Sequence, residues 1–468
     1  MRLPAVPAEV GGRLFAGILL TASLSVLDST LVVPLLSTIG EEFDAGSQIA
    51  WLVAAYLLAS TVTIPVWGRA LDLLGERKVM WTALLIFGLG SIVGALAPSL
   101  LVLVLARALQ GIGAGGLVPV SQAIISARCK PQERARLQIY YNSAYGAAAG
   151  LGPLIGGALV SVSWRWSFAL LLPLIVLAGL LLAGKLRSEP SGAPGRPFDV
   201  RGSALLTFAL LVTLVGVERS IPWVVVCGVA LIAGFVTWSL RVDHAVVPQS
   251  LLRNRTAVLI SLFVLPIGFG QFAILTYLPG LSQDLDPTLN SGLVVLPFTI
   301  LGMTMGAFTG TWALRVGTRR LAVLSAVLLS VAMLVVALSG ALPGLFVAAG
   351  LMGLAAGFAI TPALLLIQHS ADVADVGSAT SLMVLTRNFG GSLGAAVMAV
   401  LLADVGSTSA FLLAATLGVI ALIPALLLPG PLAERAIIAR REAAEPTIGY
   451  SEPSSSSGVM RPSPRVDR

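Results

Sequence analysis

The chain has 468 residues, of which 57% are hydrophobic and only 11% charged, and its mean hydropathy is +0.95. Soluble domains carry about 25% charged residues, so this much apolar surface cannot be hidden in a water-soluble core. Lipid must be the solvent of this protein, which excludes a water-soluble enzyme or binding module. Arg outnumbers Lys, and Ala, Gly, Leu and Val are abundant, which is typical of a GC-rich bacterial genome.

Fourteen apolar runs are long enough to cross a bilayer, whose core of about 30 Å requires roughly 20 helical residues. The runs are continuously apolar rather than alternating, so we expect α-helices and not a barrel. In chain order the predicted spans cover residues 14–37, 47–67, 79–98, 99–126, 137–161, 166–184, 202–217, 221–240, 256–281, 288–314, 321–340, 343–367, 377–403 and 407–429.

The positions of the basic residues indicate the orientation. If both termini are cytoplasmic, the predicted inside segments hold 25 of the 29 Lys and Arg residues, and the outside loops hold only Arg165 and Arg219. Such a bias follows the positive-inside rule. We therefore expect a multi-pass protein of the bacterial inner (cell) membrane with cytoplasmic termini. The net charge of +7 then reflects orientation rather than nucleic-acid binding.

The first predicted span contains Asp28, the only acidic residue inside any predicted span. Thr21 and Ser25 lie seven and three residues earlier, so all three share one helix face, which we expect to point into a cavity. A carboxylate held between desolvation and a neighbouring cation can load and release a proton as solvent access alternates. We interpret Asp28 as a proton carrier, with a purely structural charge pair as the alternative.

Two arginines also fall inside predicted spans. Arg107 in the fourth span is the natural partner of Asp28, and Gln110 shares its face; Arg107 could instead bond backbone carbonyls. Arg387 lies in the eleventh span. With Asp28 ionised, these three groups leave a net charge of +1, which a substrate carboxylate or phosphate, a lipid headgroup or a bound anion could balance. Alternatively, Arg387 snorkels or caps carbonyls.

Polar and aromatic residues in the spans are candidates for a substrate cavity. Tyr141 and Tyr145 share a face of the fifth span, next to Asn142, and could equally be packing aromatics. The full set of cavity candidates is Gln110, Tyr141, Asn142, Tyr145, Gln271 and Arg387. We find no spacing typical of a metal site and no catalytic constellation.

An internal repeat divides the chain. "GRALDLLGERK" (68–78) and "GTWALRVGTRR" (310–320) share glycines and an arginine at an offset of 242 residues, and glycines of the fourth span recur in the tenth at the same offset. An even number of helices per half makes the repeat parallel, with its axis along the membrane normal. The matching pairs are Gly68 and Gly310, Gly75 and Gly317, Arg77 and Arg319, Gly111 and Gly353, and Gly115 and Gly357.

These features resemble the fourteen-span drug:proton antiporter branch of the major facilitator superfamily, over roughly residues 14–429. As a set, the motifs that carry this resemblance are specific for the superfamily, but they give little information about the substrate. Glu76 stands where the family usually has a basic residue, Val33 replaces the usual Asn, and Pro34 comes early. The motifs are "LDSTLVVPLL" (27–36), "GRALDLLGERK" (68–78), "RALQGIGAG" (107–115), "GLGPLIGG" (150–157), "WRWSF" (164–168) and "PFDVRG" (197–202).

The resemblance implies a major facilitator fold, an all-α integral membrane protein with two six-helix halves plus two linker transmembrane helices. The implied parts are a cytoplasmic N-terminus (1–13), an N-terminal bundle (14–184), a linker with two extra helices (185–255), a C-terminal bundle (256–429) and a disordered cytoplasmic tail (430–468).

The resemblance also implies roles for two motifs. The loop motif would be a cytoplasmic latch between the halves, containing Gly68, Arg69, Asp72, Gly75, Arg77 and Lys78. We add the hypothesis that Asp372 and Asp375, before the eleventh span, pair with Arg77 and Lys78. In the fifth span the antiporter motif would form a bent, smooth contact on which the halves rock, made by Gly150, Gly152, Pro153, Gly156 and Gly157.

The leading prediction is a proton-coupled exporter of multiple drugs or small molecules that works by alternating access, and not an enzyme. No GxxxxGK[ST] loop is present, so the proton gradient replaces a cofactor. Its partners would be a lipophilic small molecule, protons and membrane lipids, and it would work as a monomer. One alternative is export of a lipid or cell-envelope component. A more distant alternative is a non-transporting membrane sensor or enzyme.

Overall fold

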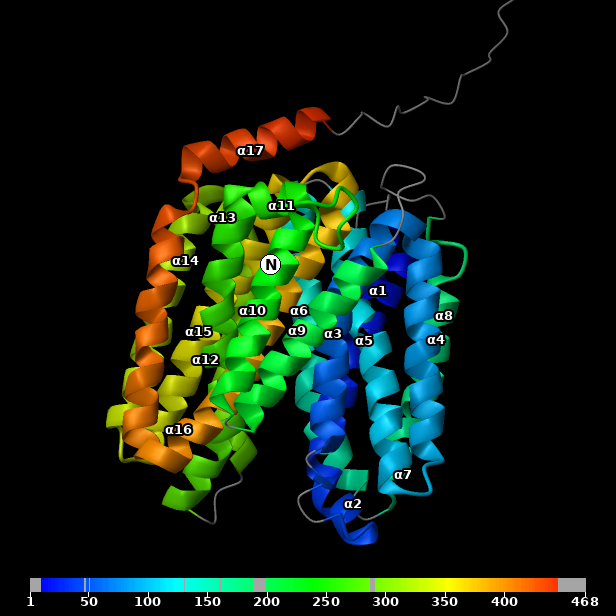
Figure 1. Ribbon diagram of the computed structural model, residues 1–468, viewed down its shortest axis with the longest axis vertical. Coiled ribbons are helices and arrows are strands. Elements are labelled where there is room, and N and C mark those ends of the chain that lie inside the picture. Colours follow the sequence, from blue (N-terminus) through cyan, green and yellow to red (C-terminus); the bar gives the residue numbers. More distant parts are fainter. Residues whose placement is uncertain are drawn as a thin grey trace, which may run out of the picture.

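The computed structural model describes residues 10–45, 48–49, 51–129, 131–159, 162–187, 199–219, 221–286 and 291–444, and these form α-helices joined by short 3-10 turns and loops (Figure 1). The first half consists of α1 (Gly12–Leu31), η1 (Val33–Leu35), α2 (Leu36–Glu42), α3 (Trp51–Leu74), α4 (Glu76–Ala95), α5 (Leu100–Arg128), α6 (Pro131–Leu159), α7 (Arg165–Ala169) and α8 (Leu171–Leu182).

A linker and the second half follow. The linker holds α9 (Val200–Glu218), α10 (Pro222–Ser239) and α11 (Gln249–Arg253). The second half holds α12 (Arg255–Leu285), η3 (Ser291–Val295), α13 (Leu296–Val316), α14 (Thr318–Leu338), α15 (Leu342–Ser370), η4 (Val373–Asp375) and α16 (Val376–Leu427), which α17 (Pro431–Ala444) follows.

Long helix α16 contains two predicted spans. Gly406 has φ 78° and ψ 167°, which is outside the helical region, and it separates a helix over residues 376–405 from one over 407–427. A left-handed φ is readily adopted by glycine because it has no Cβ. The single residue Gly406 thus supplies the turn between the last two spans.

Twelve helices of the described chain are long and apolar enough to cross a membrane, fewer than the fourteen expected. The other two predicted spans, 137–161 and 288–314, are occupied by α6 and α13, and α13 is counted only as a shorter apolar helix over Leu293–Gly306. These two helices pack against each other where the halves meet.

Two turns show the internal repeat in the backbone. Gly75 precedes α4 with φ 82°, and Gly317, which is 242 residues later, precedes α14 with φ 91°. Both turns need a residue without a Cβ at the same point of the fold. The two loops are therefore equivalent in conformation as well as in sequence.

The helix crossings repeat as well. A Cβ added at Gly111 of α5 would overlap the carbonyl oxygen of Tyr56 on α3, and a Cβ added at Gly353 of α15 would overlap that of Phe298 on α13. Gly353 lies 242 residues after Gly111, and Phe298 lies 242 residues after Tyr56. Close backbone contact at small residues is a common way for membrane helices to pack.

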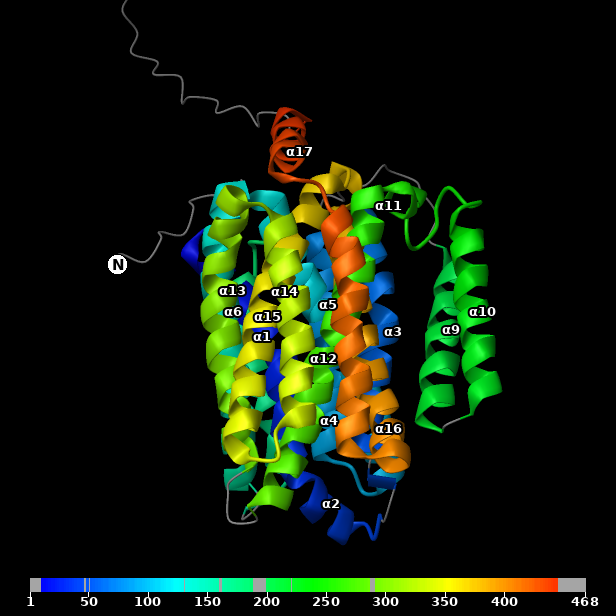
Figure 2. The same ribbon diagram turned by 90° about the vertical axis from the view of Figure 1, so that its left-hand side faces the viewer.

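The halves meet along two seams. Helix α3 packs against α16 on one side, and α6 packs against α13 on the other. The linker helices stand together beside the bundle, where α9 contacts both α3 and α16 (Figure 2). The apolar core is also divided into two large clusters and a small third one, and the large cluster of the second half includes Val62 and Ile64 of α3.

One expectation about the tail is wrong. Residues 431–444 form α17, which lies across one end of the bundle (Figures 1 and 2), instead of being disordered; residues 445–468 lie outside the described part of the chain. The helix is held because Glu434 is buried against α14 and accepts hydrogen bonds from the backbone N–H and hydroxyl of Thr318, at 2.8 and 2.6 Å.

Candidate functional site

A buried polar network joins α1 and α5. A guanidinium nitrogen of Arg107 lies 2.7 Å from Oδ2 of Asp28, and each side chain is only 1% exposed. Gln110 bridges the pair, because its Oε1 accepts from Arg107 at 2.9 Å and its Nε2 donates to Asp28 Oδ1 at 3.2 Å. Asp28 therefore points at protein groups of the first half and not at lipid.

Helix α3 fixes the orientation of Arg107. The Nε of Arg107 donates to the carbonyl oxygen of Leu52 at 3.1 Å, and the guanidinium of Arg107 lies 4.2 Å from the ring centroid of Tyr56. The Tyr56 hydroxyl in turn donates to the carbonyl of Ser25 on α1, at 2.8 Å. Arg107 thus does bond a backbone carbonyl, and it does so while it pairs with Asp28. The two roles considered from the sequence coexist.

Two members of this network were missed from the sequence, Tyr56 and Ser91. The Ser91 hydroxyl accepts a hydrogen bond from Gln110 Nε2 at 3.0 Å and is fully buried. A signal was available, since Ser91 is the one polar side chain in the run from Ala83 to Ala95. Thr21 and Ser25, in contrast, donate to carbonyls of their own helix at 2.7 and 3.0 Å and do not contact Asp28 through their hydroxyls.

The second half contributes Arg387 and Gln271. Nε and Nη2 of Arg387 each donate to Oε1 of Gln271, both at 3.1 Å, between α16 and α12. Gly268 lies against the carbonyl of Arg387 so closely that a Cβ there would overlap it. The structure therefore brings together these two cavity candidates, but it places them apart from the Asp28 pair, in the other half.

The candidates on α6 lie along the seam with the second half. Tyr141 and Tyr145 are stacked with ring centroids 6.4 Å apart and planes 12° apart. The Asn142 amide donates to the hydroxyl of Thr361 on α15, at 3.1 Å, and Gly306 of α13 packs against it. Asn142 is thus a contact between the halves.

The latch motif also joins the two halves. Asp72 at the end of α3 accepts from the backbone N–H of Gly377 at 3.0 Å, and from the N–H and hydroxyl of Ser378 at 3.0 and 2.6 Å. It acts as a cap for the first turn of α16, where a carboxylate is favoured. A Cβ at Gly68 would overlap the Ser381 hydroxyl of α16, so Gly68 permits this close approach.

The ion pair of the latch differs from the hypothesis. Asp375 lies 3.7 Å from Arg69, and both side chains are buried, whereas Arg77, Lys78 and Asp372 are exposed. The expected pairing of Arg77 and Lys78 with Asp372 and Asp375 is therefore wrong. The physical reason is that Arg69 lies on the face of α3 that packs against α16, while the turn into α4 directs the next two basic residues to solvent.

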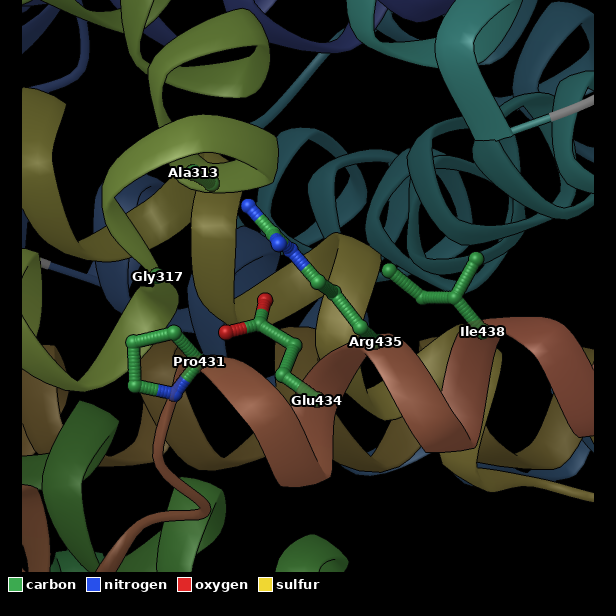
Figure 3. Close-up of a pocket in the computed structure, with 6 residues that line it drawn as sticks. All are labelled: Ala313, Gly317, Pro431, Glu434, Arg435 and Ile438. Atoms are coloured by element: carbon green, nitrogen blue, oxygen red, sulfur yellow. The ribbon is translucent and has the colours of Figure 1, made fainter.

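The equivalent loop of the second half is covered by α17. A small recess lies between this helix and the ends of α13 and α14 (Figure 3), and Thr318 of the loop is bonded to Glu434. The equivalent of Thr318 in the first half is Glu76, which lies 242 residues earlier. There the loop residue carries the carboxylate, and it pairs with Arg128 of α5. The recess is lined by Ala313, Gly317, Pro431, Glu434, Arg435 and Ile438.

The glycine motif of α6 packs inside the first half. A Cβ at Gly152 would overlap the Thr30 hydroxyl of α1, and one at Gly156 would overlap the Leu31 carbonyl, while Gly150 and Gly157 have no neighbour within 4 Å of such a Cβ. The side chain of Pro153 lies outside the described residues. The expected contact between halves is instead made on the same helix by Gly146, which packs on Met303 of α13.

Membrane-spanning helices in two related halves, with a buried ion pair in one half and polar contacts along the seam, form the architecture of a membrane transporter. A family model described as Major Facilitator Superfamily matches residues 18–313 and 260–459, and the chain belongs to this superfamily. The crystal structure of the human organic anion transporter MFSD10 (TETRAN) has the same fold. It matches 90% of this chain and 100% of that chain, with a TM-score of 0.69 and 18% identity.

Several relatives carry names of efflux proteins. The chain is 29% identical to a multidrug resistance protein B homolog of Mycobacterium tuberculosis, over 83% of this chain and 77% of the relative. It is 27% identical to the multidrug transporter protein MdtP of Bacillus subtilis, over 81% and 73%. Efflux pump FUS6 of Gibberella fujikuroi is 30% identical, over 84% and 76%.

Proposed function

We propose that the protein is a proton-coupled exporter of lipophilic small molecules that works by alternating access, with Asp28 as the proton carrier and Arg107 as its partner. The observation that carries this proposal is the buried Asp28–Arg107 pair, bridged by Gln110. Ionisable groups at such depth are costly and usually serve a function. The names of the multidrug and efflux relatives support the direction and the substrate class.

Protonation of Asp28 would change the balance of the network. The neutral acid no longer compensates Arg107, whose remaining partners are a carbonyl, an amide and an aromatic ring. A buried cation that loses its counter-ion is strongly unfavourable. The protonated protein would therefore favour an arrangement that hydrates or re-pairs Arg107, and this differential stability is what a coupled transporter requires.

The latch is the element that would open and close. With Asp72 bonded to α16 and Arg69 beside Asp375, the α17 end of the molecule is held shut. We infer from the positive-inside distribution that this end is cytoplasmic in a bacterial cell membrane. We further propose that α6 and α13 also span, which makes fourteen spans as in the drug:proton antiporter branch, and that the protein acts as a monomer.

Reconstituted protein tests the proposal. Purified protein in liposomes is given a pH gradient, and movement of ethidium is followed for the wild type, Asp28→Asn and the exposed control Asp243→Asn. We expect Asp28→Asn to lose gradient-driven movement by at least tenfold, while exchange of dye without a gradient persists. Asp243→Asn should match the wild type. Equal gradient-driven movement by the wild type and Asp28→Asn would eliminate the proposed coupling.

A further inference from the structure

Arg387 is a cation without a described acidic partner. Two of its N–H groups point at the single oxygen of Gln271, and a guanidinium has five such donors. Among the ion pairs of the described residues, none involves Arg387, whereas the other intramembrane arginine, Arg107, is paired with Asp28. Within the described part of the chain, the charge of Arg387 is therefore not neutralised by an acidic side chain.

The surroundings of Arg387 place its side chain between α16 and α12 rather than toward lipid. It is partly buried, and it donates to Gln271, which is itself buried. Close packing of Gly268 on the Arg387 carbonyl fixes where α16 crosses α12. Snorkelling to a membrane surface does not account for a side chain held by a buried Gln271.

Aromatic rings are available in the first half. Tyr141 stacks on Tyr145 of α6, and the ring of Tyr56 on α3 lies beneath Arg107. Flat aromatic faces suit the apolar body of a ligand whose charged end is held elsewhere.

We propose that Arg387, positioned by Gln271, is an anion-binding subsite that receives the carboxylate or phosphate of an otherwise lipophilic substrate. This inference rests on the proposed function and narrows its substrate class. With Asp28 and Arg107 neutralising each other, a monoanion compensates the remaining charge and a cation is repelled. The free N–H groups of a guanidinium match the two oxygens of such a group.

A pair of probes that differ only in charge tests the subsite. Pyrenebutyrate and its neutral primary amide are bound to purified full-length protein in neutral-lipid nanodiscs, and their affinities are compared. We expect Arg387→Gln to weaken pyrenebutyrate by about tenfold or more, and the amide by less than about twofold. Arg387→Lys should restore much of the difference, and the exposed control Arg320→Gln should leave both affinities unchanged.

Each outcome separates the subsite from the transport mechanism. Equal losses for both probes, or an unchanged preference in Arg387→Gln, would overturn the subsite even if ethidium transport still depends on Asp28. A preference that follows Arg387 supports it even if Asp28→Asn leaves transport intact. Adding phosphatidylglycerol distinguishes the sources, since competition with pyrenebutyrate in the wild type alone indicates a lipid headgroup, and no competition indicates a soluble acid.

Discussion

The polar centre of the first half has an apolar counterpart in the second half. Ser91, Arg107 and Gln110 are buried around Asp28, and the glycine crossing next to them is reproduced 242 residues later. The comparison teaches that the scaffold is duplicated while the charged network around Asp28 is confined to one half. The residues at the three equivalent positions are Met333, Ala349 and Met352, all fully buried.

The largest expected effect comes from breaking the charge pair that only the first half has. Arg107→Met should destabilise the protein by about 3–5 kcal/mol, because it leaves a buried carboxylate unpaired. Adding Asp28→Asn to Arg107→Met should recover part of that stability but none of the proton-driven transport. Thermal unfolding in detergent measures the stability of both variants, and the liposome assay measures their transport. Additive losses in the double variant would contradict a direct interaction.

The shared scaffold predicts equal effects in both halves. Gly111→Ala and Gly353→Ala each place a Cβ against a carbonyl oxygen of the neighbouring helix, so each should cost about 1–3 kcal/mol. Gly157→Ala is the control, because nothing lies within 4 Å of its Cβ. Unfolding midpoints of the three variants test this. A large loss at only one of the two crossings would show that the scaffold is not equivalent.

The latch provides a smaller effect that distinguishes two ion pairs. Arg69→Asp should loosen the contact between α3 and α16 and reduce transport severalfold, and Asp375→Arg in the same chain should restore it. Arg77→Asp combined with Asp375→Lys should show no such rescue. Transport rates and cross-linking of introduced cysteines across the seam are the measurements. Rescue in the Arg77 pair would reinstate the contact that the structure replaces.

The smallest effect concerns α17, which covers the second half alone. Burial raises the pKa of Glu434 above its ordinary value, although the Thr318 hydrogen bonds oppose this. The docked helix therefore binds a proton more readily than the released one, so docking is strongest below the ordinary pKa of Glu and weakens as pH rises through the raised pKa. Hydrogen exchange of α17 between pH 4 and 8 should show this, and Glu434→Gln should abolish it.

Glu42 at the opposite end of the molecule is the internal control for that experiment. The hydrogen bond from Trp164 comes first among the causes that lower its pKa, with Arg165 adding to the effect. A lowered pKa has the opposite sign, since the contribution is present above the ordinary pKa and is lost as pH falls through the lowered one. The same direction of pH response at both ends would contradict these assignments.

Sequence reasoning reached the helices because lipid imposes a simple rule on their length and composition. It also reached the repeat and the Asp28–Arg107 contact, since a lone acid in apolar helices has few possible partners. It did not reach Tyr56 and Ser91, because an aromatic or a single serine in an apolar span carries no sign of its partner. The polar network became visible only when four helices, α1, α3, α4 and α5, were placed side by side.

The errors arose where side-chain direction decides the partner. The latch motif contains three basic residues within ten positions, Arg69, Arg77 and Lys78. Only the rotation of α3 about its axis decides that Arg69 is the one that faces Asp375. The glycines of α6 likewise could pack on either neighbour, and α1 rather than α13 receives Gly152 and Gly156. The helix over 431–444 was missed because its order depends on Glu434 finding Thr318, a contact far apart in sequence.

The extra helices α9 and α10 make the two flanks of the molecule unequal. Because α9 contacts both α3 and α16, a second layer of helices covers the seam on that flank, whereas the flank of α6 and α13 has one layer of helices. In the proposed alternating access, the added pair would move with one half and slide over the other. A hydrophobic compound diffusing within the leaflet thus meets two layers of helices on one flank and one layer on the other.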